Sequence, residues 1–185
     1  MILPIYAYGQ PVLRKKSVSI TSDYQDLVTL IADMYETMYS AKGVGLAAPQ
    51  IGRDIRLFVI DTLQLDKKDK VANGMKQVFI NAQMVDESGD PWLYEEGCLS
   101  IPDIHVEIER NPTIRLKYFD AEWNEHTETF DGVNARVIQH EYDHIEGILF
   151  IDRMKPLKRR MINRKLEKIK KGEIESNHPM RFLKT

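Results

Sequence analysis

The feature that most constrains this chain is a stripe of four residues on one predicted helix. Val133, Val137, His140 and His144 are separated by four, three and four positions. At 3.6 residues per turn, this spacing places all four side chains on one inward face. Two of these positions hold histidine where an ordinary core would hold Leu or Ile. The fold must therefore bury this helix and also provide partners for two imidazoles.

Hydrogen-bonded core histidines are one explanation of the stripe, and a metal ion is the other. Residues 140–144 read H-E-Y-D-H, and in H-E-x-x-H one helical turn brings both Nε2 atoms to one ion about 2.0–2.1 Å away. Glu141 lies beside the ligands, off their direction, where it can reach a water at the metal. The coincidence of these residue types at this spacing favours the metal site.

A catalytic metal site needs a third protein ligand, which must come from elsewhere in the chain. The metzincin extension H-E-x-x-H-x-x-G-x-x-H fails here, because Gly147 is present but Phe150 stands in place of the last histidine. Cys98 is the better candidate, since it is the only cysteine and follows Gly97 in a region of strands and turns. An inert buried cysteine is the alternative. Weaker ligand candidates are the downstream carboxylates Glu167, Glu173 and Glu175.

The size and composition are those of an ordinary globular protein. The 185 residues are 43% apolar and 29% charged, so we expect a single catalytic domain over 1–185. A net charge of -2 gives no reason to expect DNA as a partner. One cysteine excludes an intrachain disulfide and indicates a reducing compartment. No signal peptide is visible and the apolar runs are too short for a membrane, so we expect a soluble cytoplasmic protein.

Local patterns in the first half of the chain predict one helix and two strands. An amphipathic helix is expected over 23–41, capped by Ser22 or Asp23. Strands are expected over 55–60 and 78–82, and the polar segment 64–77 between them is expected to be an exposed loop.

In the second half, apolar and polar residues alternate over 105–110 and 113–120, which predicts antiparallel strands with one solvent-exposed face. The central helix follows, with Asp131 as candidate N-cap and Gly147 as its stop, and 148–152 resembles a further strand. Together the patterns indicate an α+β fold rather than alternating βαβ units. We expect short antiparallel sheets packed around a central H-E-x-x-H helix, with an N-terminal helix and a basic C-terminal helix over about 156–172.

The glycine-rich stretch G-V-G-L-A-A-P-Q (43–50) formally fits a dinucleotide-binding fingerprint. It follows a helix instead of a strand, however, and Pro49 would break the helix that should begin there. A structural turn fits better. So does a backbone ledge along a metal cleft, with Gln50 carrying an amide into it.

Three stretches together resemble the signature motifs of the peptide deformylase family in order and spacing. They are G-V-G-L-A-A-P-Q (43–50), E-G-C-L-S (96–100) and Q-H-E-Y-D-H (139–144). The resemblance covers nearly the whole chain, and the part past residue 150 is similar to the bacterial type with a C-terminal helix. It implies a hydrolase that releases formate from the N-terminal formyl-methionine of nascent proteins.

The resemblance also assigns roles at the metal. It implies that Cys98, His140 and His144 bind one divalent ion and that Glu141 is the general acid/base. The family metal is usually Fe²⁺, and Zn²⁺, Ni²⁺ or Co²⁺ can occupy the site. The thiolate ligand by itself permits both iron and zinc.

On the substrate side, the resemblance implies that Gln50 and the backbone N–H of Leu99 hold the formyl oxygen. Gly45 would offer backbone hydrogen bonds to the peptide. Val44, Leu99 and Val137 are candidates for the walls of an apolar pocket that takes the methionine side chain, although Val137 is equally well explained as ordinary core.

One position departs from the family pattern. Many members carry an arginine where this chain has His105, five residues beyond Ser100. The substrate contact of that arginine is therefore not carried over, and we interpret His105 as an exposed strand residue.

The C-terminal helix is strongly basic, with ten Lys or Arg against one Glu between residues 153 and 171. A solvated helix face is the simplest interpretation of such a run. Docking to ribosomal RNA near the exit tunnel is the alternative, and the resemblance supports it.

Two other functions fit part of the sequence. A zinc endopeptidase would explain H-E-x-x-H alone. A non-catalytic metal-binding or ribosome-associated protein would need a fourth protein ligand to close the site. His126 and His178 lie far from the motifs in sequence and are expected to be surface residues, so neither is a convincing fourth ligand.

Overall fold

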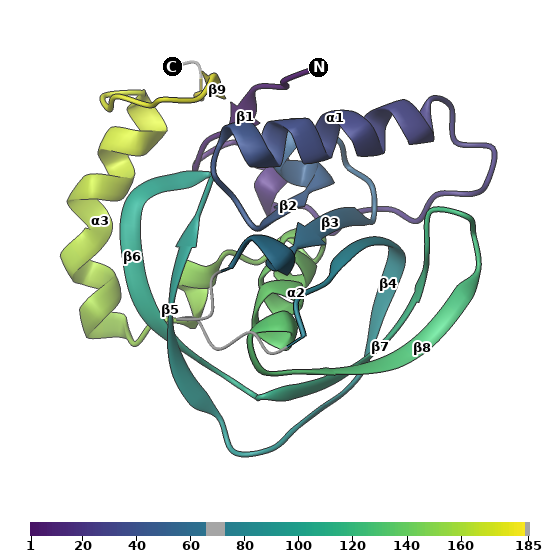
Figure 1. The fold of residues 1–185 in the computed structure, drawn as a ribbon. Helices are drawn as coiled ribbons and strands as arrows, with labels where there is room; N and C mark the ends of the chain where they lie inside the picture. Colours follow the sequence, from purple (N-terminus) through teal and green to yellow (C-terminus); the bar gives the residue numbers. More distant parts are fainter. Residues whose placement is uncertain (66–72, 184–185) are drawn as a thin grey trace.

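The computed structural model describes residues 1–65 and 73–183. It has an α+β architecture in which helix α2 (Gly132–Ile145) lies inside a shell of strands (Figure 1). One wall is an antiparallel sheet in the order β2-β3-β4-β7-β8, and another is the hairpin β5-β6. The predicted fold class, with antiparallel sheets around the H-E-x-x-H helix, is confirmed.

The sheet strands are β2 (Gly45–Ala47), β3 (Leu57–Asp61), β4 (Lys76–Ser88), β7 (Thr113–Phe119) and β8 (Glu125–Asp131). The hairpin strands are β5 (Trp92–Cys98) and β6 (Ile101–Arg110). The strands predicted over 55–60, 78–82, 105–110 and 113–120 fall within or largely overlap these elements. Residues 66–72 of the predicted loop lie outside the described residues.

Helix α2 is held against the sheet by an aromatic core. Phe79 stacks on Phe58, with 4.7 Å between ring centroids, and contacts Tyr118 at 4.5 Å. Val133 and Val137 of the predicted stripe join this cluster and are each 8% exposed. Because the apolar half of the stripe is anchored here, its histidine half faces the hairpin β5-β6 on the other side.

Helix α1 (Leu27–Ser40) packs its apolar face on β2 and β3 (Figure 1). It begins later than predicted, after Asp26, which has a φ of 58° and makes no side-chain cap. The predicted cap at Ser22 or Asp23 is wrong, because the Asp23 carboxylate accepts from the Thr21 hydroxyl in a preceding turn.

A short 3-10 helix, η5 (Phe150–Arg153), replaces the strand predicted over 148–152. Asp152 accepts a hydrogen bond from the backbone N–H of Leu149 at 2.9 Å, which closes the turn. Phe150 and Ile151 are both buried, so the apolar run reflects burial of a turn and not strand pairing. Among the described residues, the other short 3-10 helices are η1 (Pro11–Arg14), η2 (Ala48–Ile51) and η3 (Thr62–Gln64).

The basic helix α3 (Pro156–Lys171) lies on the outside, beyond the hairpin (Figure 1). Its bounds match the prediction, with Pro156 in the first turn and Gly172 in the left-handed conformation at the end. Leu166 and Ile169 are its buried residues. The tail then returns, and β9 (Met180–Arg181) pairs in parallel with β1 (Ile5–Tyr6). Within the described residues, helices have neither the length nor the apolar character to cross a membrane.

Candidate active site and metal centre

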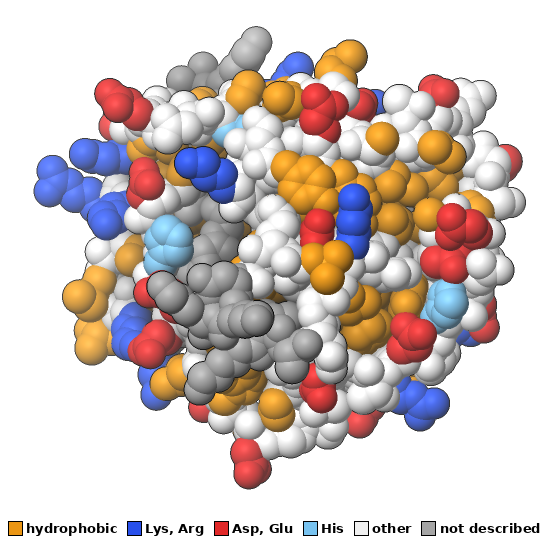
Figure 2. All heavy atoms as spheres, viewed as in Figure 1, with side chains coloured by type: hydrophobic (Ala, Val, Ile, Leu, Met, Phe, Trp, Pro, Cys, Tyr) orange, Lys and Arg blue, Asp and Glu red, His pale blue; other side chains and the backbone are white. Residues whose placement is uncertain are grey.

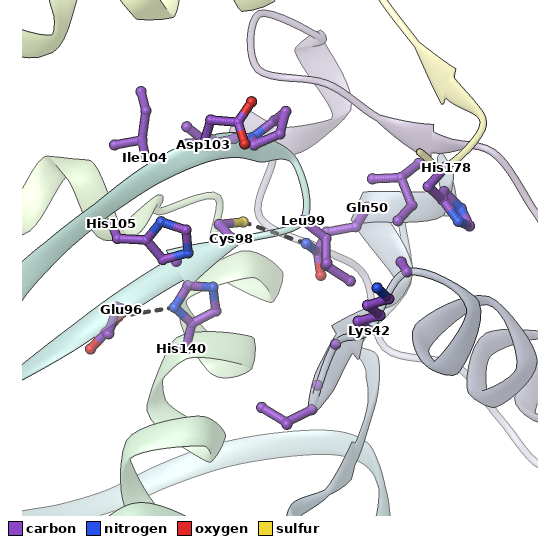
Figure 3. Close-up of a pocket in the computed structure, with 18 of the residues that line it drawn as sticks. Lys42, Gln50, Glu96, Cys98, Leu99, Asp103, Ile104, His105, His140 and His178 are labelled. Carbon is purple, nitrogen blue, oxygen red and sulfur yellow. Dashed lines mark hydrogen bonds and ion pairs between the residues drawn. The ribbon is translucent and has the colours of Figure 1, made fainter. Parts of the chain in front are cut away.

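The residues of all three sequence motifs open onto one cleft of about 650 Å³. Its walls come from α2, the strand β2, the turn between β5 and β6, and the C-terminal tail around residues 175–180. Figure 3 shows Cys98 and His140 at one part of this cleft, with Gln50 and Leu99 beside them.

Three ligand atoms converge at the centre of the cleft. One atom each from Cys98, His140 and His144 lies within 4.8 Å of the others. The Sγ of Cys98 is 3.3 Å from Nε2 of His144. Among the described residues, these three side chains form the one group of His, Cys or carboxylate side chains that lie close enough together to share an ion.

The donor set fits a divalent metal. A thiolate with two imidazoles suits zinc or iron and leaves a coordination position open for water or substrate. Burial lowers the pKa of His144 well below its usual value, which favours the neutral ring that ligation requires. At His140, burial is outweighed by hydrogen bonds with Cys98 and Glu96, which raise the pKa, so a metal would displace a proton there. The Cys-His-His centre is thus a metal site of the catalytic type.

His140 is oriented by a residue to which the sequence patterns assigned no role. Its Nδ1 lies 2.9 Å from Oε2 of Glu96 (Figure 3). A carboxylate on Nδ1 leaves Nε2 free for a metal and fixes the direction of the ring. Glu96 stands two residues before Cys98 in E-G-C-L-S, and that proximity was the available signal.

The carboxylate of Glu141 lies against the backbone of Gly45. A Cβ added at Gly45 would be 2.4 Å from Oε1 of Glu141, so glycine is needed there for the carboxylate to occupy its position. Glu141 is 4% exposed and its Oε2 has no hydrogen-bond partner among the described residues. Burial raises the pKa of Glu141 to about 7, which suits a general acid/base at neutral pH.

The amide of Gln50 is held in one orientation. The backbone N–H of Ala47 donates to its Oε1 at 2.8 Å. Its Nε2 therefore points at Cys98, 3.6 Å from Sγ, and lies 3.3 Å from Oγ of Ser100 (Figure 3). The amide thus presents an N–H donor beside the metal ligands. Leu99 lines the same part of the cleft.

The predicted wall residues Val44 and Val137 line the same cleft. Tyr94 and Arg136 also line it and were not predicted. The Arg136 guanidinium lies over the Trp92 ring, 4.8 Å from its centroid, and its Nη2 donates to the carbonyl of Trp92 at 2.7 Å, so the side chain is held in place. No periodic pattern in the sequence distinguishes such a wall from ordinary core.

His105 is exposed, as predicted, and it also lines the cleft. Its ring lies against Gly97, where a Cβ would be 2.7 Å from Cδ2 of the imidazole. The surface position expected for His178 is wrong. His178 is 9% exposed, donates from Nε2 to the carbonyl of Leu3 at 3.1 Å, and lines the cleft. The pairing of β9 with β1 brings it there.

The remaining ligand candidates lie outside the metal group. His126 pairs with Asp120 at 2.8 Å on the far strand β8. Glu167 is on the outer helix α3, and Glu175 lines the cleft without joining the three ligands. Glu173, just after α3, is likewise absent from that group.

Comparisons with known proteins agree with this geometry. The family model described as polypeptide deformylase matches residues 2–160. The peptide deformylases of Christiangramia forsetii and Flavobacterium johnsoniae are 51% and 52% identical to this chain, each match covering 98% of this chain and 96% of the relative. The crystal structure of a peptide deformylase from Legionella pneumophila superposes with a TM-score of 0.82 at 38% identity, covering 95% of this chain and 99% of that one. The crystal structure of a peptide deformylase from Thermotoga maritima superposes with a TM-score of 0.74 at 40% identity, covering 84% of this chain and 99% of that one.

Proposed function

The chain belongs to the peptide deformylase family, and we propose that it removes the formyl group from the N-terminal formyl-methionine of nascent peptides, releasing formate. The observation that carries this function is the convergence of three ligand atoms in one cleft with a buried carboxylate beside them. Glu141 and the glycine ledge at Gly45 complete the arrangement.

Cys98, His140 and His144 would hold the ion, and we propose Fe²⁺ as the native metal. Zn²⁺, Ni²⁺ and Co²⁺ suit the same donors. When bound, a divalent ion in such a site acts as a Lewis acid and lowers the pKa of water towards about 7.

Glu141 serves as the general acid/base. Its carboxylate takes a proton from the attacking water and returns it to the leaving amine, so both transfers use one group. A pKa of about 7 leaves the side chain able to accept and to donate at neutral pH. The contact with Gly45 keeps the carboxylate beside the ligands.

Gln50 and the backbone N–H of Leu99 hold the formyl oxygen. The hydrogen bond from Ala47 to Oε1 of Gln50 fixes the amide with its N–H groups towards the site. Removing one donor of this kind costs about 10²–10³ in rate in comparable sites. Gly45 offers backbone hydrogen bonds to the peptide.

The methionine side chain enters the apolar part of the cleft, where Val44, Leu99 and Val137 form its walls. A formyl carbon carries only hydrogen, so a crowded cleft admits it and rejects bulkier acyl groups. We also propose that His105, which lines the same cleft, contacts the peptide beyond the first residue.

The test is formate release from formyl-Met-Ala-Ser by enzyme purified anaerobically with metal analysis. Glu141→Gln is expected to keep its metal and to lose formate release. Near-normal turnover by that variant would remove Glu141 from the mechanism. A parallel assay on casein distinguishes a zinc endopeptidase, which would cleave within chains and leave the formyl peptide intact.

We further propose that α3 brings the enzyme to the ribosome. Lys and Arg side chains gather over α3 at the left edge of Figure 2, and only its Leu166 and Ile169 are buried. Charge reversal of the exposed Lys158, Arg160 and Arg164 should reduce co-sedimentation with ribosomes at low salt. Reversal of three cations on the sheet, Lys76, Arg115 and Lys117, is the control. Equal co-sedimentation of all variants would contradict ribosome docking through α3.

A further inference from the structure

A closed ring of charged groups joins the metal-binding helix to the hairpin β5-β6. Nδ1 of His140 donates to Oε2 of Glu96 at 2.9 Å. Arg110 donates to both oxygens of Glu96, from Nε at 2.7 Å and Nη2 at 2.9 Å. Its Nη1 donates to Oδ2 of Asp143 at 2.7 Å. Asp143 lies three residues after His140 on α2, so the helix backbone closes the ring.

The members of this ring are buried. Glu96, Arg110 and Asp143 are 5%, 4% and 3% exposed. A buried charge is tolerated when paired and is costly when its partner is removed. Each of these three groups is hydrogen-bonded to at least two other charged or ring groups. Removing one of them therefore leaves its neighbour with one partner fewer.

Arg153 adds an external clamp to the ring. Its Nε and Nη2 donate to the two oxygens of Asp143 at 2.7 and 2.6 Å. The side chain is 37% exposed, and the residue ends η5, just before α3 begins at Pro156. Asp143 is thus held between two guanidinium groups, one inside the protein and one near its surface.

We infer that Asp143 and Arg153 are positioning residues for the metal ligands, an inference that rests on the proposed metal-dependent function. Two ligands lie on α2, whereas Cys98 lies on the hairpin, two residues beyond Glu96. A shift of the hairpin along the helix would therefore change the distance from Sγ to the imidazoles. The ring fixes this relative position, and Asp143 is its anchor on α2.

Metal affinity separates this role from simple stabilisation of the fold. Asp143→Asn keeps the shape of the side chain and removes its charge. The dissociation constant for Zn²⁺, measured by competition with a chelator, should rise about tenfold, the low end of the range for groups that orient metal ligands. The absorption bands of the Co²⁺-loaded variant should also shift, because they report the geometry of the thiolate and imidazole ligands.

Arg153 provides a variant on the surface that is expected to fold. Arg153→Met removes the charge and the clamp, and should weaken Zn²⁺ binding less than Asp143→Asn does. Arg153→Lys restores the charge without the two-pronged geometry and should recover part of the affinity. Glu125→Gln is the control, because Glu125 pairs with Lys117 on the strands β7 and β8 and not with the ring. Its Zn²⁺ affinity should equal that of the unmodified enzyme.

Wild-type Zn²⁺ affinity and an unchanged Co²⁺ spectrum in both Asp143→Asn and Arg153→Met would overturn the inference. Losses no larger than that of Glu125→Gln would overturn it as well, since they would reflect general destabilisation. Failure of the proposed function has a different signature. The unmodified enzyme would then bind metal normally and release no formate from formyl-Met-Ala-Ser.

Discussion

The thiol of Cys98 lies 3.3 Å from Nε2 of His144, although 46 positions separate the two residues in the sequence. The hairpin β5-β6 ends against α2 and brings Cys98 to the two histidines. We predict that Cys98→Ala lowers the bound metal, measured by elemental analysis of anaerobically purified protein, because two imidazoles remain as ligands. Unchanged stoichiometry and affinity would exclude Cys98 from the ligand set.

A second prediction concerns the residue that orients His140. Glu96→Gln is expected to raise the dissociation constant for Zn²⁺ by about 10–100-fold, because the neutral amide holds the imidazole less firmly than the carboxylate does. Chelator competition measures the change. Glu95→Gln is the matched control, since Glu95 is the neighbouring carboxylate but is exposed. Equal affinities for the two variants would show that the hydrogen bond to His140 has no effect on the metal.

A third prediction tests the contact between Gly45 and Glu141. The Cβ of Gly45→Ala would lie 2.4 Å from Oε1 of Glu141, so the carboxylate must move. A displacement of about 1 Å at a reacting group costs about 10²-fold, and kcat/KM for the formyl peptide should fall by this order while the metal content stays constant. Gly74→Ala is the control, because its Cβ would meet the backbone of Leu63 and neither residue lines the cleft. A similar loss in both variants would contradict the specific role of Gly45.

A fourth prediction concerns stability in acid. Burial raises the pKa of Asp152, but hydrogen bonds from Arg14 and from the N–H of Leu149 outweigh it and leave the pKa below its usual value. The folded protein thus binds this proton less readily than the unfolded chain does. The contribution of Asp152 is present above pH about 4, the ordinary value for Asp, and is lost as pH falls through the lower folded value.

Asp152→Asn should therefore lower the free energy of unfolding at pH 7 by about 0.5–1 kcal/mol, the scale of a partly exposed ion pair. The difference from the unmodified protein should shrink as the pH falls below 4. Urea unfolding over a pH series measures both effects. Glu87→Gln, at an exposed carboxylate of β4, should leave the pH profile unchanged. A constant difference for Asp152→Asn at all pH values would show that the ion pair is not responsible.

Local sequence patterns predicted the helices better than they predicted the turns and the tertiary contacts around them. The bounds of α3 follow from Pro156 and Gly172, which act within one turn of the helix ends. The strand prediction for residues 148–152 was wrong because buried residues such as Phe150 and Ile151 give the same apolar pattern in a turn as in a strand. The position of His178 was wrong because the pairing of β9 with β1 joins segments from opposite ends of the chain.

The sequence by itself determined the contacts that lie within one element. Helical periodicity places His140, Glu141 and His144 on adjoining positions of one turn, whatever the rest of the chain does. Only the tertiary structure decided which groups meet these three across elements. Glu96 reaches His140, Gly45 makes room for Glu141, and the tail enters the cleft. These contacts depend on how the helix, hairpin and sheet pack, and no local spacing encodes that packing.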